Sequence, residues 1–122
     1  MMTLTITQYH YLVVISQLSK QLEEVRSIDV AVELGVARAT TSRMINYLVD
    51  EGWINRHRRA LTLSSKAELL LRETNEHYHV LYDYFSKMNL DALEIKTCVD
   101  VLCEEIPSQT LNKICEYVKN HD

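Results

Sequence analysis

Residues 27–54, SIDVAVELGVARATTSRMINYLVDEGWI, form the stretch that decides the fold. Two segments with apolar residues at helical spacing, 27–34 and about 38–51, are separated by a turn at Gly35. A glycine in this place is typical of a helix that ends in the left-handed conformation, and Ser27 is a good N-cap for the first segment. The stretch therefore predicts two short helices joined by a tight turn, the helix-turn-helix arrangement.

The segment that follows, WINRHRRALTL at 53–63, predicts two short antiparallel strands. Gly52 ends the preceding helix, and the apolar pairs Trp53-Ile54 and Leu61-Leu63 flank a basic tip at residues 55–59. A hairpin placed directly after a helix-turn-helix forms the wing of a winged helix.

Before this region, the chain from about Thr5 to Glu24 is predicted as one helix. Its apolar residues recur at helical spacing and form one stripe. The stripe consists of Tyr11, Val14, Ile15, Leu18 and Leu22.

Three further helices are predicted after the hairpin. Ser65 with Glu68 has the spacing of a capping box and opens a helix to about Met88, and Asp91 with Glu94 repeats that spacing and opens a helix to about Glu105. Pro107 stops it, and Ser108 begins a final helix. The apolar face of that helix consists of Leu111, Ile114, Cys115 and Val118. The predicted fold class is mainly α, a winged helix-turn-helix followed by a helical dimerisation region.

Composition agrees with this fold class. The 122 residues include only 2 Gly and 1 Pro, too few turn formers for a sandwich or barrel. No apolar run approaches a membrane span and no signal peptide is recognised, so we expect a cytoplasmic protein that does not bind membranes. The 3 cysteines, an odd number, are expected to be reduced thiols.

The charge is distributed unevenly along the chain. Residues 1–66 carry 8 basic and 6 acidic side chains, whereas residues 67–122 carry 5 and 11. A basic part joined to an acidic part is typical of a DNA-binding domain, here residues 1–66, followed by a helical regulatory or dimerising domain, here residues 67–122. The other interpretation is an ordinary uneven surface charge.

The exposed side of the second helix of the motif suits base edges in the major groove, and the basic hairpin suits the DNA backbone or minor groove. A helix N-terminus near Arg38 also favours a phosphate. The predicted DNA-binding residues are Arg38, Thr40, Ser42, Arg43, Asn46, Arg56, Arg58 and Arg59, with His57 as a further contact on the wing. The other interpretation of this surface is a winged helix that packs only against protein.

One group of residues in the second half can bind a metal ion. Asp100, Cys103 and Glu104 share a face of one predicted helix, because they lie at positions i, i+3 and i+4. Carboxylates and a thiolate are competent ligands for divalent metals, and His79 and His10 are nitrogen donors elsewhere in the chain. Each residue also has an ordinary interpretation, Cys103 as a small buried hydrophobe and the carboxylates as a solvated face.

Residues 27–54, followed by LTLSSKA at 61–67, resemble the metal-dependent repressors of the diphtheria-toxin-repressor and manganese-transport-regulator (DtxR/MntR) family. The family pattern is roughly "DIA..L.V....VSRMI..L..EG.V" and then "L.LT.KG". YLVVISQL at 11–18 and His79 in HYHVLYDYFSKM at 77–88 extend the resemblance over nearly the whole chain. A chain of this length is similar to the short members that lack an extra C-terminal domain.

The resemblance implies a metal site at His10, His79, Asp100, Cys103 and Glu104. Val13 stands where the family has a second ligand on the first helix, and Cys103-Glu104 replaces a Glu-His pair. These departures leave open a changed metal, the loss of one of two metals, or the loss of the site. A thiolate beside imidazole and carboxylate favours zinc, iron or cobalt over manganese.

The function predicted from the sequence is a metal-responsive transcriptional regulator, a repressor that binds double-stranded DNA as a homodimer on a pseudo-palindromic operator. One alternative is a winged-helix regulator controlled by a small ligand or thiol oxidation. Another is a protein-interaction module. An enzyme is not expected, because the sequence has no phosphate-binding glycine loop, nucleophile motif or His-Glu-x-x-His motif.

Overall fold

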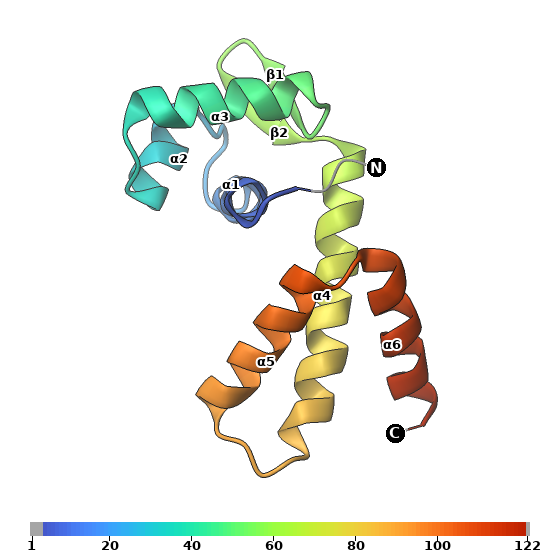
Figure 1. Ribbon diagram of the computed structural model, residues 1–122. Helices are drawn as coiled ribbons and strands as arrows, with labels where there is room; N and C mark the ends of the chain where they lie inside the picture. The colour runs from blue at the N-terminus through green and yellow to red at the C-terminus, as the bar shows by residue number, and fades with distance from the viewer. Residues whose placement is uncertain (1–3, 122) are drawn as a thin grey trace. The chain divides into compact units, whose positions relative to one another are not determined.

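The computed structural model describes residues 4–121, except for the side chain of Ile6. Most of this range is helical, and one two-stranded antiparallel sheet lies between the third and fourth helices (Figure 1). The elements are α1 (Ile6–Ser19), α2 (Ser27–Leu34), α3 (Arg38–Asp50), β1 (Ile54–His57), β2 (Ala60–Leu63), α4 (Ser65–Ser86), α5 (Ala92–Glu105) and α6 (Ser108–Asn120). The predicted fold class, a winged helix-turn-helix followed by helices, is confirmed.

The chain forms two compact units. The first ends at Leu71 and the second begins at Arg72, so the division falls inside α4. The sequence alone placed the domain boundary between residues 66 and 67, at the start of that helix. The first turns of α4 belong to the first unit because Ala67, Leu70 and Leu71 pack against its core.

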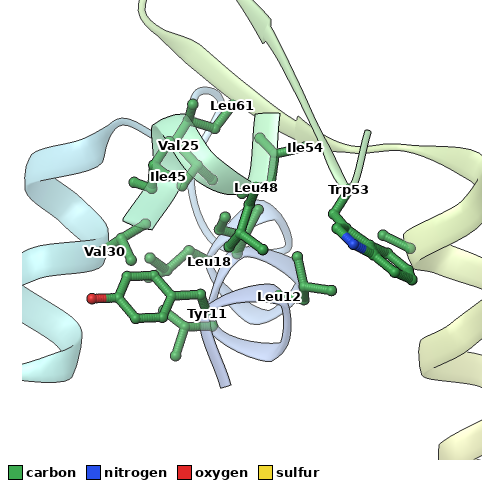
Figure 2. Packing of buried hydrophobic residues seen from close by; sticks show 13 residues of the cluster. Tyr11, Leu12, Leu18, Val25, Val30, Ile45, Leu48, Trp53, Ile54 and Leu61 are labelled. Carbon is green, nitrogen blue, oxygen red and sulfur yellow. The ribbon is translucent and has the colours of Figure 1, made fainter. Parts of the chain in front are cut away.

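The core of the first unit lies between α1, α2, α3 and the hairpin (Figure 2). Leu12 and Ile15 of α1 are completely buried, and the predicted stripe of α1 holds as far as Leu18. Leu22 is the exception, because α1 ends at Ser19 and Leu22 lies in the connection to α2, with 40% of its surface exposed. The prediction that this helix continues to Glu24 is therefore wrong.

The helix-turn-helix forms as predicted. Gly35 ends α2 with φ +67°, the left-handed conformation that glycine adopts without steric cost. The start of α2 differs by one residue from the prediction, because Arg26 and not Ser27 is the N-cap. The Asp29 carboxylate accepts a hydrogen bond of 2.9 Å from the Arg26 amide, which fixes the chain at the entry to the helix.

Two sets of contacts hold the hairpin against the rest of the first unit. Ile54 of β1 and Leu61 of β2 are buried in the core, and the partner of Ile54 across the sheet is Leu63. Leu61 also forms an isolated antiparallel bridge with Val25, and its amide donates to the Val25 carbonyl at 2.8 Å. This single bridge fastens the segment before α2 to the edge of the two-stranded sheet.

The second unit consists of the remainder of α4 together with α5 and α6. Its buried residues are Leu81, Ile95, Val99, Leu111 and Cys115. The predicted capping box of Asp91 and Glu94 is present at the start of α5. The cap of α4 is Ser64 and not Ser65, because the Ser64 hydroxyl accepts from the Ala67 amide at 3.2 Å.

Within residues 4–121, no helix is both long enough and apolar enough to cross a membrane.

Candidate functional site

Helix α3 has one buried and one exposed side. Thr41, Ile45 and Leu48 are completely buried against the first core, because they recur at helical spacing on one face. The side chains predicted to contact base edges lie on the other face, and all are exposed: Thr40, Ser42, Arg43 and Asn46. Arg38, which is predicted to favour a phosphate, is exposed in the first turn of the helix. The burial of one face thus leaves short polar and Arg side chains on the surface.

The N-terminus of α3 suits an anion. Its N-cap is Ala37, whose methyl group cannot accept a hydrogen bond from the amides of the first turn. Residues 38–49 contain no carboxylate, and acidic residues follow only at Asp50 and Glu51, the C-terminal end of the helix. The positive end of the helix dipole therefore coincides with Arg38, an arrangement that favours a phosphate oxygen.

The hairpin carries its charge at the tip. Arg56 and His57 are exposed at the end of β1, and Arg58 and Arg59 form the two-residue connection to β2. The tip is shorter than the predicted range of 55–59, since Asn55, Arg56 and His57 belong to the strand. Arg58 has φ +60°, an unusual conformation for a residue with a Cβ atom. The wing therefore presents three exposed guanidinium groups on a tight turn.

The three predicted metal ligands on α5 lie at one end of that helix in different environments. Asp100 is paired with Lys96 at 2.8 Å, Glu104 is exposed, and Cys103 is partly buried against the second core. Burial raises the pKa of the Cys103 thiol, and the neighbouring Cys115, Asp100 and Glu104 raise it further. The thiolate that would bind a metal is therefore disfavoured in the metal-free protein.

The two histidines of the predicted metal site lie on other helices. His79 is exposed on α4, and His10 is exposed on α1 in the first unit, with its ring 6.4 Å from that of Tyr9. Across residues 4–121, no three His, Cys, Asp or Glu side chains are arranged to hold a metal ion. The metal site of these five residues therefore stays a prediction.

A cavity of about 380 Å³ lies in the second unit and involves none of the five predicted ligands. Its lining includes the buried His77, whose Nε2 is hydrogen-bonded to the side-chain oxygen of Asn112 at 2.5 Å. Cys115 and Lys119 of α6 also line it, and Lys119 pairs with Glu76 of α4. His77 thus connects α4 to α6 through a side-chain hydrogen bond.

Residues 4–60 match the model of the MarR family. The match lies within the first unit and covers slightly less than half of the chain. Over 112 residues the chain is 22% identical to the transcriptional regulator MntR of Escherichia coli O6:H1, covering 91% of this chain and 72% of that protein. The chain is thus similar to MntR at low identity, and membership of the DtxR/MntR family stays a prediction.

Two solved structures share the fold. The hypothetical protein SSo2273 from Sulfolobus solfataricus aligns with a TM-score of 0.81 and 14% identity over 94% of this chain and 89% of that one. The metal-dependent transcriptional regulator MtsR aligns with a TM-score of 0.73 and 18% identity over 92% of this chain and 53% of that one. The arrangement of a winged helix followed by helices thus recurs in proteins of low sequence identity.

Proposed function

We propose that the chain is a DNA-binding transcriptional regulator that acts as a homodimer on a pseudo-palindromic operator. The observation that carries this proposal is the surface formed by α3 and the wing. Exposed Arg43 and Asn46 on α3 can donate to base edges, and exposed Arg58 and Arg59 can neutralise phosphates. MarR-type sequence over residues 4–60 and relatives described as regulators support it.

The two parts of this surface have different tasks in the proposal. Arg43 and Thr40 lie where a helix in the major groove meets base edges, so they would determine which sequence is bound. The guanidinium groups of the wing would strengthen binding to every sequence, because phosphates carry no sequence information. Two copies of α3 in a dimer would then read two half-sites.

A binding experiment with a duplex selected from a random pool tests this division of tasks. Arg43→Ala should lower affinity for the selected duplex by about tenfold and relax the base preference at one position. Arg58→Ala with Arg59→Ala should weaken binding to all duplexes and reduce the salt slope by about 1–2. An unchanged salt slope in the double variant would show that the wing does not contact DNA.

The variant Arg58→Gly distinguishes an effect of Arg58 on DNA affinity from an effect on the stability of the wing. Glycine adopts a positive φ without steric cost, so the variant should be at least as stable as the parent while it loses one phosphate contact. If Arg58→Gly binds DNA with the parent's affinity and salt slope, Arg58 is only a turn residue.

Metal control is the finer part of the proposal. MntR relatives support it, and so does the structural neighbour MtsR, which is described as metal-dependent. The three donor side chains on one side of α5 support it as well. The residues described here do not fit a preformed metal site, since no three donors meet within the chain and Asp100 is engaged with Lys96. A regulator without metal control, the second candidate, is favoured by these same two observations.

Elemental analysis of the purified protein, combined with DNA binding with and without a chelator, distinguishes the two candidates. Metal control predicts about one zinc, iron or cobalt ion per chain and a loss of affinity on chelation, with manganese as the alternative ion. Cys103→Ser should then weaken zinc binding far more than manganese binding. Metal-free protein that binds the duplex with unchanged affinity would support the regulator without metal control.

A further inference from the structure

Lys66, at the start of α4, contacts both the end of α3 and the residue that leads into the wing. It is the second residue of α4, and its ammonium donates a hydrogen bond of 2.9 Å to the carbonyl of Glu51, the C-cap of α3. The same ammonium lies 4.1 Å from the centre of the Trp53 ring. Trp53 is the residue that leads from α3 into β1, so one cation connects the end of α3, the entrance to the wing and the start of α4.

The chemistry of each contact suits a cation. The last carbonyls of a helix have no partner within the helix and lie at the negative end of its dipole. An ammonium above an indole ring is attracted by the negative face of the ring. Gly52, with φ +82°, lies between the two contacts, and a Cβ atom there would be 3.9 Å from the ammonium. The turn from α3 into the wing therefore passes directly beneath Lys66.

The backbone around Trp53 is also held on both sides. Its amide donates to the Leu48 carbonyl at 2.9 Å, and its carbonyl accepts from the Ser64 amide at 3.1 Å. These bonds join the end of α3 to the base of the wing, and Lys66 adds a side-chain contact to the same junction. Lys66 itself is exposed, so its contribution to the stability of the unit is small.

We propose that Lys66 is a positioning residue that holds the wing in register with α3, so that the wing tip and the exposed face of α3 can contact one duplex at the same time. This inference rests on the proposed DNA-binding function. Lys66 acts through Trp53 and the Glu51 carbonyl and does not itself contact phosphate.

The test compares Lys66→Met with Lys66→Arg, using a duplex selected by the parent protein. Methionine keeps an apolar chain over Trp53 and removes the ammonium, whereas arginine keeps the charge and can donate to the Glu51 carbonyl. Lys66→Met should bind about tenfold more weakly at a fixed salt concentration, the equivalent of one good contact. Its salt slope should equal that of the parent, and Lys66→Arg should recover most of the affinity.

Lys20→Met is the matched control, because it removes an exposed ammonium from the same unit beyond the end of α1. Thermal unfolding followed by Trp53 fluorescence checks that each variant is folded at the binding temperature. The emission of Trp53, the only tryptophan of the chain, should change in Lys66→Met and not in Lys20→Met.

The possible results separate this inference from the proposed function. A salt slope reduced by about one in Lys66→Met would show that Lys66 contacts phosphate directly, and an unchanged affinity would show that the junction holds without it. Either result overturns the positioning role while DNA binding stands. If the parent protein binds no duplex, the proposed function fails, and the positioning role fails with it.

Discussion

The two units of the chain differ in how much apolar surface each buries. Among the described residues, the first unit has a cluster of 13 buried hydrophobic residues drawn from α1 to α4, whereas the cluster of the second has five. The second unit also exposes large apolar side chains on its own helices, with Leu93 73%, Val101 51% and Tyr117 64% exposed. The larger core packs the first unit more like an independent domain. Both units expose large apolar side chains, and the proposed homodimer would cover those of the second unit.

The largest expected effect concerns the first core. Leu48→Ala removes a completely buried side chain from α3 and should lower the free energy of unfolding of the first unit by about 3 kcal/mol. Leu111→Ala in the smaller second core should cost less, about 2 kcal/mol, because a loosely packed site collapses more easily around the cavity. Denaturant unfolding followed by Trp53 fluorescence measures the first effect, and hydrogen exchange of α6 measures the second. Equal losses would mean that the two cores are equally well packed.

The next prediction compares two side chains that are each 73% exposed, Leu93 of α5 and Val32 of α2. If the second unit forms the dimer, Leu93→Glu should raise the dissociation constant of the dimer at least about tenfold, because it places a charge in an apolar interface. Val32→Glu, in the first unit, should leave the dimer unchanged. Sedimentation equilibrium or light scattering at micromolar concentration measures both. A parent protein that is monomeric in this range contradicts the proposed homodimer.

A smaller effect is expected from the one buried side-chain oxygen that lacks a hydrogen-bond partner within the described residues, Oγ1 of Thr41. Thr41→Val keeps the shape of the side chain and removes the unsatisfied hydroxyl, so it should stabilise the first unit by about 1 kcal/mol. Thr40→Val, at the exposed neighbouring position, should change stability by less than about 0.5 kcal/mol. The shift of the Trp53 unfolding midpoint measures both variants, and destabilisation by Thr41→Val would show that the hydroxyl contributes to the core.

The smallest expected effect concerns the pH dependence of the second unit. The hydrogen bond and charge of Lys119 lower the pKa of Glu76 below its ordinary value of 4.5. The stabilisation by this pair is therefore complete above pH 4.5 and is lost as the pH falls through the lowered pKa. Glu76→Gln should be slightly less stable than the parent at pH 7, and the difference should vanish in acid. Glu105→Gln on α5 is the control, and a difference that persists at pH 3 would contradict this assignment.

The exposed polar and basic surface of α3 and the wing could be predicted almost entirely from the sequence. The exposed face of α3 follows from its helical period, because burying Ile45 and Leu48 leaves Arg43 and Asn46 on the opposite side. The basic wing tip follows from apolar pairs on either side of Arg58 and Arg59. The contacts of Lys66 could not be predicted in this way. They exist because the folded chain places the start of α4 beside the end of α3.

The positions of the candidate metal ligands could be predicted only in part. The sequence places Asp100, Cys103 and Glu104 at one end of α5, since they are separated by one helical turn. Whether His79 lies close to these three residues depends on the rotation of α4 relative to α5. The periodicity within a single helix does not predict that rotation. In the structure His79 is exposed, and the buried histidine of α4 is His77, which bonds to Asn112 of α6.

The sequence by itself determined the order of the elements, the turn at Gly35 and the basic face of the first unit, because helical period, glycine conformation and charge are local properties. The tertiary structure decided the features that depend on distant partners. Val25 pairs with Leu61, although the helix-turn-helix separates them in the sequence. Helix α1 ends at Ser19, although apolar residues at helical spacing continue to Leu22. These features depend on contacts between residues that are far apart in the sequence. A local sequence pattern therefore does not predict them.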